Sequence, residues 1–345
     1  MYGENYGYRS GLNQSMVNHL NKKVNYLENL VFLKDDDLVI DIGSNDSTTL
    51  RSYFSNKIKK VGIDPTGEKF KEFYPEDIHL ISSFFPTDKL FEIFPSKRAK
   101  IITSISMFYD LEDPLSFVEA ITKTLHRNGI WHLEQSYLPT MLEKNSYDTI
   151  CHEHLEYYSS KIIIYIMKKN KLRVFDLIRN NVNGGSVRYY ISHDNSHFKT
   201  NTRDINKLLK EEKKYMLESK KVFKKFEKKL ILNKKKLMNF IYKIKKAKKI
   251  IHGYGASTKG NVLLQYFKIS NKHIDFIADR NPQKYNKYTP GTKIKIISEK
   301  KSRKIKPDYY LVLPWHFKNE IIKREKIIRK YGTKLIFPLP KMQIV

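Results

Sequence analysis

Short apolar runs alternate with polar, helix-compatible stretches between about residues 38 and 134. The runs are almost continuously apolar, which is typical of strands that are covered on both faces of a parallel sheet. We predict five strands, at LVIDI (38–42), KVGID (60–64), IHLISS (78–83), KIITSIS (100–106) and GIWHLE (129–134). Strands that alternate with helices form right-handed β-α-β units, so this part of the chain is predicted to be a parallel α/β sheet.

The pattern changes between about residues 135 and 200. RVFDLI (173–178) and SVRYYIS (186–192) are strand-like, and RNNVNGG joins them. Two such runs around a Gly-Gly turn predict an antiparallel strand pair. We expect this pair to be an elaboration of the first domain that covers a site.

A third pattern occupies residues 203–248, where apolar residues recur every seven positions. The row consists of Leu209, Met216, Phe223, Leu230, Leu237 and Ile244. The intervening row is only half apolar, because it contains Ser219 and Asn233 as well as Phe226 and Phe240. This favours a long helical connector, or a helix pair packed along one domain, over a free coiled coil.

A second alternation of strands, Gly-rich turns and helices follows the helical segment. Its strand-like runs lie in KIIHGYGASTKGN, HIDFIAD, DYYLVLP and KLIFPLP. The predicted fold class is therefore α/β, with two successive Rossmann-like domains joined by a long lysine-rich helical segment. We place the first domain at 1–200, the connector at 201–248 and the C-terminal domain at 249–345.

Composition narrows the functional classes. The single cysteine, Cys151, cannot form an internal disulfide or a Cys-rich zinc site, which points to a reducing compartment. No apolar stretch approaches the roughly 20 residues of a membrane span, and MYGENYGYRSG is not a signal peptide. We expect a cytoplasmic protein without membrane association, present as a monomer or a weak dimer.

The net charge of +29 suggests a nucleic-acid-binding protein or an RNA methyltransferase as an alternative. However, lysine far outnumbers arginine, 53 to 12, whereas base-reading surfaces favour arginine forks. Residues 203–249 alone hold 19 basic residues against five acidic ones. A solvated helical face explains such a run better, so nucleic acid is the disfavoured partner.

The segment LVIDIGSNDSTTL predicts a ligand site at the carboxyl end of a strand. Asp41 and Gly43 lead into a polar turn with Ser44 and Asn45, and Asp64 ends the next strand at a spacing suited to a ribose. Walker and complete GxGxxG motifs are absent, so a ligand with a positive centre fits better than a phosphate. We predict S-adenosyl-L-methionine, with Ser104 as a further cofactor contact. Helix caps and a strand end are the alternative explanation.

Six segments together resemble the sugar C-methyltransferase family, which acts on nucleotide-linked keto-deoxysugars. They are YGYRSGLNQSMVNHL (6–20), VIDIGSNDSTTL (39–50), YDTICHEHLEYYS (147–159), NGGSVRYYI (183–191), GYGASTKGNVLLQYF (253–267), and YTPGTKIKI with PDYYLVLPWHFKNEI. The resemblance implies a methyltransferase domain that binds S-adenosyl-L-methionine and a C-terminal domain that helps to hold the nucleotide sugar.

This chain departs from the family pattern in two ways. Family members usually begin with a small Cys-rich zinc domain, and this chain starts where that domain would end, so no metal is expected. Ser47 stands where the family generally has Gly, and a positive φ there would strain the backbone.

The stretch His152, Glu153 and His154 carries the predicted chemistry. In an extended segment the two histidines would share a face, which leaves a metal pair or two structural histidines as alternatives. The resemblance places Glu153 and His154 at the reacting sugar. Forming a C–C bond beside a ketone requires an enolate, so we predict His154 as the base, Glu153 as its orienting carboxylate and His152 as a substrate contact.

The enolate oxygen needs a hydrogen-bond donor, and the N-terminal segment offers Tyr8 first and Tyr6 second. Many family members have a histidine in the region of SMFYDLEDP, where this chain has Tyr109. Tyr109 is therefore a candidate acid-base group or sugar contact, and a packed aromatic side chain is the alternative.

GYGASTKG follows a strand and precedes a helix, as in a Rossmann-type turn. Gly253, Gly255 and Lys259 are predicted to bind the phosphates of the sugar nucleotide at the helix N-terminus. Asp279 ends the next strand and either meets a ribose or caps a turn.

The predicted activity is methyl transfer from S-adenosyl-L-methionine to carbon of a nucleotide-diphosphate keto-sugar. A sugar O-methyltransferase is the first alternative, and an NAD-dependent sugar oxidoreductase is a weaker one.

Overall fold

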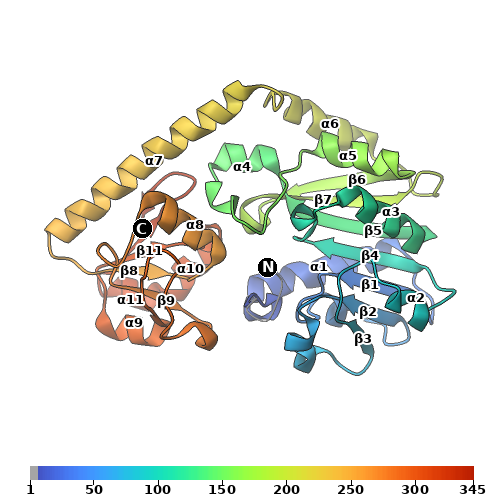
Figure 1. The fold of residues 1–345 in the computed structure, drawn as a ribbon, viewed down its shortest axis with the longest axis horizontal. Coiled ribbons are helices and arrows are strands. Elements are labelled where there is room, and N and C mark those ends of the chain that lie inside the picture. Colours follow the sequence, from blue (N-terminus) through green and yellow to red (C-terminus); the bar gives the residue numbers. More distant parts are fainter. Residues whose placement is uncertain (1–6) are drawn as a thin grey trace. The chain divides into compact units, whose positions relative to one another are not determined.

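The computed structural model describes residues 7–345, which divide into two units (Figure 1). Unit 1 contains the described residues up to Tyr137 together with Leu155–Asn180 and Ser186–Glu212. Unit 2 contains Leu138–His154, Asn181–Gly185 and Lys213–Val345. Residues 152–154, called the HEH segment below, therefore fold with unit 2, although most of the chain on either side of them belongs to unit 1.

Unit 1 is built on one seven-stranded sheet with the order β3-β2-β1-β4-β5-β7-β6. Its strands are β1 (Leu38–Ile42), β2 (Lys59–Ile63), β3 (Ile78–Ile81), β4 (Ala99–Ile105), β5 (Leu125–Ser136), β6 (Leu172–Asn180) and β7 (Ser186–His193). The first five strands are parallel, and β7 runs antiparallel to both β5 and β6. The predicted parallel strands and the antiparallel pair are confirmed. The pair extends the edge of the same sheet, and its role as a cover over a site stays a prediction.

Burial on both faces explains why the strands of unit 1 are so apolar. Along β1, Val39 belongs to one hydrophobic core and Ile40 to another, because successive side chains point to opposite faces of the sheet. Helices cover the sheet, and they are α1 (Gln14–Leu30), α2 (Lys89–Ile93), α3 (Pro114–Thr124), α5 (Ser160–Lys169) and α6 (Thr202–Lys213).

Unit 2 repeats the parallel arrangement on a smaller scale, with the strand order β10-β9-β8-β11-β12-β13. Its strands are β8 (Ile251–Tyr254), β9 (Phe276–Asp279), β10 (Ile296–Ser298), β11 (Tyr309–Val312), β12 (Lys334–Phe337) and β13 (Gln343–Ile344). Only β13 is antiparallel to its neighbour. Its helices are α4 (Leu138–Lys144), α7 (Lys220–Lys246), α8 (Thr258–Phe267), α9 (Glu299–Ile305), α10 (Lys318–Arg324) and α11 (Lys326–Lys330). Both units are Rossmann-like, as predicted.

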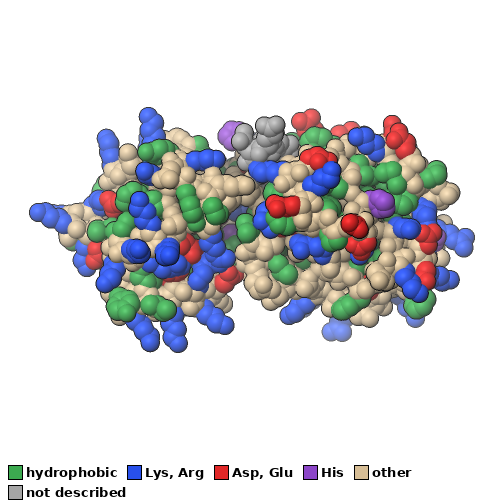
Figure 2. Space-filling model, turned by 90° about the horizontal axis from the view of Figure 1, so that it is seen from below, with side chains coloured by type: hydrophobic (Ala, Val, Ile, Leu, Met, Phe, Trp, Pro, Cys, Tyr) green, Lys and Arg blue, Asp and Glu red, His purple; other side chains and the backbone are tan. Residues whose placement is uncertain are grey.

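The lysine-rich segment forms a pair of helices, α6 and α7, and the boundary between the two units follows Glu212. Of the predicted apolar row, Leu230, Leu237 and Ile244 are buried, whereas Met216 and Phe223 are 55% and 42% exposed. The heptad row therefore describes only the second half of the segment. Most lysines of α7 lie on its exposed face, and lysine and arginine side chains are spread over the face shown in Figure 2.

Within residues 7–345, no helix combines the length and the apolar content that a membrane crossing requires. In the same part of the chain, no three His, Cys, Asp or Glu side chains are arranged to hold a metal ion.

Candidate active site

The turn predicted to bind the cofactor, Gly43–Asn45, is called the cofactor turn below. It lies at the carboxyl end of β1, where the strand order of unit 1 reverses. Open parallel sheets bind their ligands at this point. Gly43 has a φ of +75°, and a β-carbon there would lie 3.3 Å from the Met107 side chain. Glycine therefore allows the turn and leaves room beside it. Ser44 and Asn45 are buried in the same turn.

Two carboxylates belong to this turn, and their environments differ. Asp41 is buried and accepts a hydrogen bond from Thr103. Burial raises the pKa of Asp41 to about 7. The other carboxylate, Asp64, accepts hydrogen bonds from the Asn45 amide (2.8 Å), the Thr66 amide (2.7 Å) and the Thr66 hydroxyl (2.6 Å). Since a carboxylate has about four acceptor sites, Asp64 already holds the turn closed and has little capacity left for a ribose.

Two further side chains lie at the turn or beside it, and only one of them, Ser104, was predicted from the sequence. The Tyr74 hydroxyl donates to the Asn45 carbonyl at 2.9 Å and lies 2.8 Å from the Ser44 hydroxyl. Ser104, a predicted cofactor contact, is buried and accepts a hydrogen bond from the Trp131 indole at 3.1 Å. Tyr74 lies 29 residues beyond Asn45, and nothing in its local sequence pattern indicates this role.

The N-terminal segment crosses the cofactor turn and is fixed to it by backbone contacts. The Gly11 amide donates to Asp46 and the Ser10 amide to Asn45, each at 3.0 Å. The Asn45 side chain in turn donates to the Tyr8 carbonyl at 3.0 Å. Tyr8 is thereby anchored beside the turn with its side chain 48% exposed. Tyr6, the second predicted donor, lies outside the described residues.

Tyr109 follows β4 and is buried in the main core of unit 1. Its carbonyl accepts hydrogen bonds from the Leu155 amide at 2.9 Å and the Glu156 amide at 3.0 Å. The structure thus fixes the backbone of Tyr109 at the point where the chain re-enters unit 1 after His154.

Ser47 has a φ of +57°, so the position does require the left-handed conformation that glycine adopts freely. Its hydroxyl donates to the Phe73 carbonyl at 2.5 Å, and this bond offsets part of the strain. Ser47 is also fully buried. The hydroxyl therefore gives this chain a reason to keep serine at a glycine position.

We expect Ser47→Ala to lower the free energy of unfolding by about 0.5–1.5 kcal/mol, because alanine keeps the strain and loses the hydrogen bond. Ser47→Gly relieves the strain, but it loses the same hydrogen bond and raises the conformational entropy of the unfolded chain. The free energy of unfolding should therefore change by no more than about 1 kcal/mol. Thermal unfolding of both variants measures this order. Equal losses in the two variants would show that the left-handed backbone carries no cost here.

The HEH segment forms a turn instead of the extended strand assumed above, so its histidines do not share one face. His152 is exposed, whereas Glu153 and His154 are half-buried. Burial, and then the charge of Lys259, lowers the pKa of His154 to about 4. The imidazole is thus unprotonated at neutral pH and can accept a proton. Glu153 accepts a hydrogen bond from the Cys151 thiol.

The GYGASTKG turn lies in unit 2 with the HEH segment. Gly255 has a φ of +84°, and a β-carbon there would lie 2.8 Å from Pro314, so the turn requires glycine. A β-carbon on Gly253 would similarly meet Ile277 at 2.8 Å. Lys259 is the second residue of α8 and donates to the Asn183 carbonyl at 3.2 Å. The sequence analysis assigned His154 and Lys259 to different sites. In the structure, the charge of Lys259 acts on His154.

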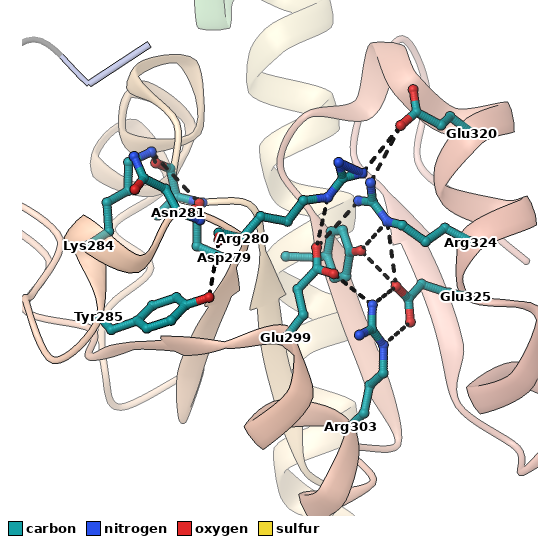
Figure 3. A network of polar contacts seen from close by, with 12 residues as sticks. Asp279, Arg280, Asn281, Lys284, Tyr285, Glu299, Arg303, Glu320, Arg324 and Glu325 are labelled. Atoms are coloured by element: carbon teal, nitrogen blue, oxygen red, sulfur yellow. Dashed lines mark hydrogen bonds and ion pairs between the residues drawn. The ribbon is translucent and has the colours of Figure 1, made fainter. Parts of the chain in front are cut away.

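Asp279 plays the same part in unit 2 as Asp64 does in unit 1. It accepts hydrogen bonds from the amides of Ala256 (2.7 Å) and Asn281 (2.8 Å), as Figure 3 shows in part. Lys284 donates to the Ala256 carbonyl at 2.8 Å. The turn-capping alternative for Asp279 thus has direct contacts in the structure.

The amino-acid sequence is similar to those of known C-methyltransferases. Residues 181–340 match the family described as C-methyltransferase C-terminal domain. The chain is 26% identical over 332 residues to the C-methyltransferase NovU of Streptomyces niveus, covering 96% of this chain and 79% of NovU.

Solved methyltransferase structures show a weaker likeness. The plantazolicin methyltransferase BpumL, in complex with a triazolic desmethylPZN analog and SAH, is 11% identical with a TM-score of 0.42, covering 54% of this chain and 88% of that one. The N-methyltransferase NodS from Bradyrhizobium japonicum is 12% identical with a TM-score of 0.38, covering 52% and 98%. The sequence matches make the chain similar to C-methyltransferases, and it is an enzyme that uses S-adenosyl-L-methionine as its methyl donor.

Proposed function

We propose that this enzyme methylates a carbon atom of a nucleotide-diphosphate keto-deoxysugar. The observation that carries the proposal is His154, an imidazole that burial keeps unprotonated. It lies in the same unit as a Rossmann-type turn and a half-buried lysine. A C-methyltransferase needs a base of this kind, because the hydrogen beside a ketone must be removed before that carbon can form a new bond.

The residues of the turn after β1 fit S-adenosyl-L-methionine. Gly43 leaves space against Met107 that a β-carbon would enter. The Asp41 carboxyl is buried, and among the described residues no cation lies within ion-pair distance of it. A free carboxyl of this kind suits the positive amino-acid end of the cofactor. The cofactor supplies an activated methyl group, so the chain itself must provide only alignment and a base.

We infer that the sugar nucleotide is held by unit 2. Helix α8 presents its N-terminus beside the Gly255 turn. The Gly260 amide donates to the Ser257 hydroxyl and the Asn261 amide to the Ser257 carbonyl, which leaves the Thr258 and Lys259 amides without a partner among residues 7–345. Free amides at a helix N-terminus favour an anion such as a diphosphate. Lys284 lies on the Ala256 carbonyl of the same turn and adds positive charge.

His154 accepts the proton from the carbon beside the ketone, and the electron pair of that C–H bond forms the enolate. Glu153 lies beside the imidazole and favours its protonated form once the proton has been transferred. The enolate carbon then takes the methyl group, S-adenosylhomocysteine is the leaving group, and His154 returns its proton to solvent before the next turnover.

The product separates this function from O-methylation. The purified enzyme is incubated with S-adenosyl-L-methionine and a panel of keto-sugar nucleotides, and the product is analysed by mass spectrometry and NMR. We expect one added methyl group bonded to carbon. A methyl group on oxygen would establish the sugar O-methyltransferase alternative, and the absence of methylated product from every keto-sugar would contradict the substrate class.

Cofactor binding should depend on pH through Asp41. Its pKa is raised to about 7 by burial, and a positively charged ligand favours the ionised carboxylate, so binding releases a proton below this pH. We expect the affinity for S-adenosyl-L-methionine to rise about tenfold from pH 5.5 to 7.5, which corresponds to about one unit of pKa shift on binding. Calorimetric titration at several pH values measures it. Asp41→Asn should bind with a much flatter pH profile; an unchanged profile would show that Asp41 does not face the cofactor.

A further inference from the structure

Unit 2 contains a group of buried polar atoms that lack hydrogen-bond partners. Among the described residues, these atoms include Thr140 Oγ1, Ser146 Oγ, Asp148 Oδ1 and His316 Nδ1. Thr140, Ser146 and Asp148 are each at most 3% exposed. Buried polar groups are almost always hydrogen-bonded, so several unpartnered atoms in one region indicate that a polar ligand or water completes them.

These atoms surround a short segment that starts at Asn183. A β-carbon on Gly184 would lie 3.5 Å from the Trp315 ring and 4.0 Å from the Ser146 hydroxyl, and one on Gly185 would collide with Thr140. The Asn183 carbonyl accepts the hydrogen bond from Lys259. The unpartnered atoms and the half-buried lysine therefore belong to one cluster within unit 2.

Asp148 and Lys259 are the charged members of this cluster. Asp148 Oδ2 accepts a hydrogen bond from the Trp315 indole at 2.9 Å, which fixes the carboxylate and leaves Oδ1 without a partner. Burial lowers the pKa of Lys259, and the negative charge of Asp148 acts in the opposite direction. The charge of Lys259 in turn acts on His154 and His316. Asp148 thus helps to keep Lys259 protonated beside the proposed base.

The charge balance of the cluster distinguishes between two ligands. A diphosphate group prefers several cations and free amides, and a buried carboxylate such as Asp148 would repel it. A sugar ring is neutral, and its hydroxyl groups can pair with Thr140, Ser146 and the free oxygen of Asp148. The cluster therefore suits the ring of the substrate better than its phosphates, in contrast to the phosphate role that the sequence suggested for Lys259.

We propose that Lys259 is a second catalytic group, which stabilises the enolate oxygen of the sugar, and that Asp148 is its positioning residue. This inference rests on the proposed function. As the C–H bond beside the ketone breaks, the proton passes to His154 and the negative charge develops on the carbonyl oxygen, where the Lys259 ammonium pairs with it. The charge returns to neutral when the carbon bonds to the methyl group and S-adenosylhomocysteine leaves.

The test separates enolate formation from methyl transfer and from binding. The keto-sugar nucleotide that yields product is incubated with the full chain and S-adenosylhomocysteine in deuterium oxide, and deuterium uptake beside the ketone is followed by NMR. Methyl transfer is measured separately, and affinities for uridine and thymidine diphosphate are measured by calorimetry. We compare Lys259→Met, Lys259→Arg, Tyr8→Phe and the control Lys268→Met, which removes an exposed lysine at the other end of α8.

We expect Lys259→Met to slow both deuterium uptake and methyl transfer by about 10²–10³-fold, the usual effect of removing one oxyanion donor. Nucleoside diphosphate affinity should stay within about threefold, Lys259→Arg should retain more activity than Lys259→Met, and Lys268→Met should match the wild type. If Lys259→Met instead weakens diphosphate binding while deuterium uptake at saturation is normal, Lys259 binds phosphate and the proposal fails. It also fails if only Tyr8→Phe slows the uptake.

The pH dependence of deuterium uptake in Asp148→Asn distinguishes a positioning role from a merely structural one. Lys259 is faced by Asp148, Cys151, His154 and His316. Removing the Asp148 charge lowers the pKa of Lys259, so the alkaline limb of deuterium uptake should move to lower pH by about one unit. An unmoved limb would overturn the positioning role. A wild-type enzyme that methylates another substrate class would instead refute the proposed function, and that outcome is visible before any variant is made.

Discussion

His154→Gln is expected to lower the rate of methyl transfer by about 10²–10⁴-fold, the usual contribution of a general base. Glutamine has a similar size and can form hydrogen bonds, but it cannot accept the proton. Because glutamine keeps the size and the hydrogen-bonding capacity of the side chain, affinity for S-adenosylhomocysteine should be unchanged. Single-turnover kinetics and calorimetric titration measure the two quantities separately.

The pH profile adds a second check on the same residue. The pKa of His154 is lowered to about 4, so the wild-type rate should be independent of this group above about pH 5 and fall only below it. His79→Gln, which changes an exposed histidine on β3, is the matched control and should behave as the wild type. A His154→Gln enzyme with full deuterium uptake beside the ketone would assign the base to another residue.

The parallel sheets could be predicted from the sequence because burial on both faces leaves a continuous apolar run. The whole of β1 is buried, and its predicted limits of residues 38 and 42 coincide with the observed strand. The same reasoning was less successful at Met216 and Phe223. Met216 lies in the break between α6 and α7, and Phe223 lies in the solvated first turn of α7, so only the packed second half of α7 keeps the predicted row buried.

A ligand site at the turn after β1 could be predicted from the sequence because its glycine and carboxylates are close together in the chain. The unit 2 cluster was not, because its key contact joins Asp148 to Trp315 across 167 residues. Neither residue has a local pattern that reveals a partner at such a distance. The sequence also did not show that the HEH segment and Lys259 belong to the same unit. They do so because residues 138–154 and 181–185 fold with the C-terminal part of the chain.

An ion-pair network in unit 2 provides the stability prediction with the largest effect. Glu325 is 1% exposed and accepts two hydrogen bonds from Arg303, at 2.9 and 2.5 Å, and one from the Tyr254 hydroxyl at 2.7 Å (Figure 3). Arg324 also donates to the Tyr254 hydroxyl, at 2.8 Å. Glu325 is therefore the buried acceptor on which these groups converge.

We expect Glu325→Ala to lower the free energy of unfolding of unit 2 by about 2–4 kcal/mol, because it leaves Arg303 and Tyr254 without their buried acceptor. The value lies at the lower end for buried ion pairs, since the Arg303 side chain is 36% exposed and water can solvate part of its charge. For a unit of this size such a loss lowers the melting temperature by roughly 5–15 °C. Differential scanning calorimetry resolves the change if the two units melt separately.

Glu320→Ala is the matched control, because Glu320 belongs to the same network but its side chain is 32% exposed. Its contacts to Arg280 and Arg324 are both 3.4 Å long. Partly solvated pairs of this kind contribute about 0–1 kcal/mol, so this variant should melt close to the wild type. Glu325→Gln, which keeps one acceptor oxygen, should fall between the two. If Glu325→Ala and Glu320→Ala destabilise unit 2 equally, burial does not decide the strength of this network, and the Glu325 contacts behave as ordinary surface pairs.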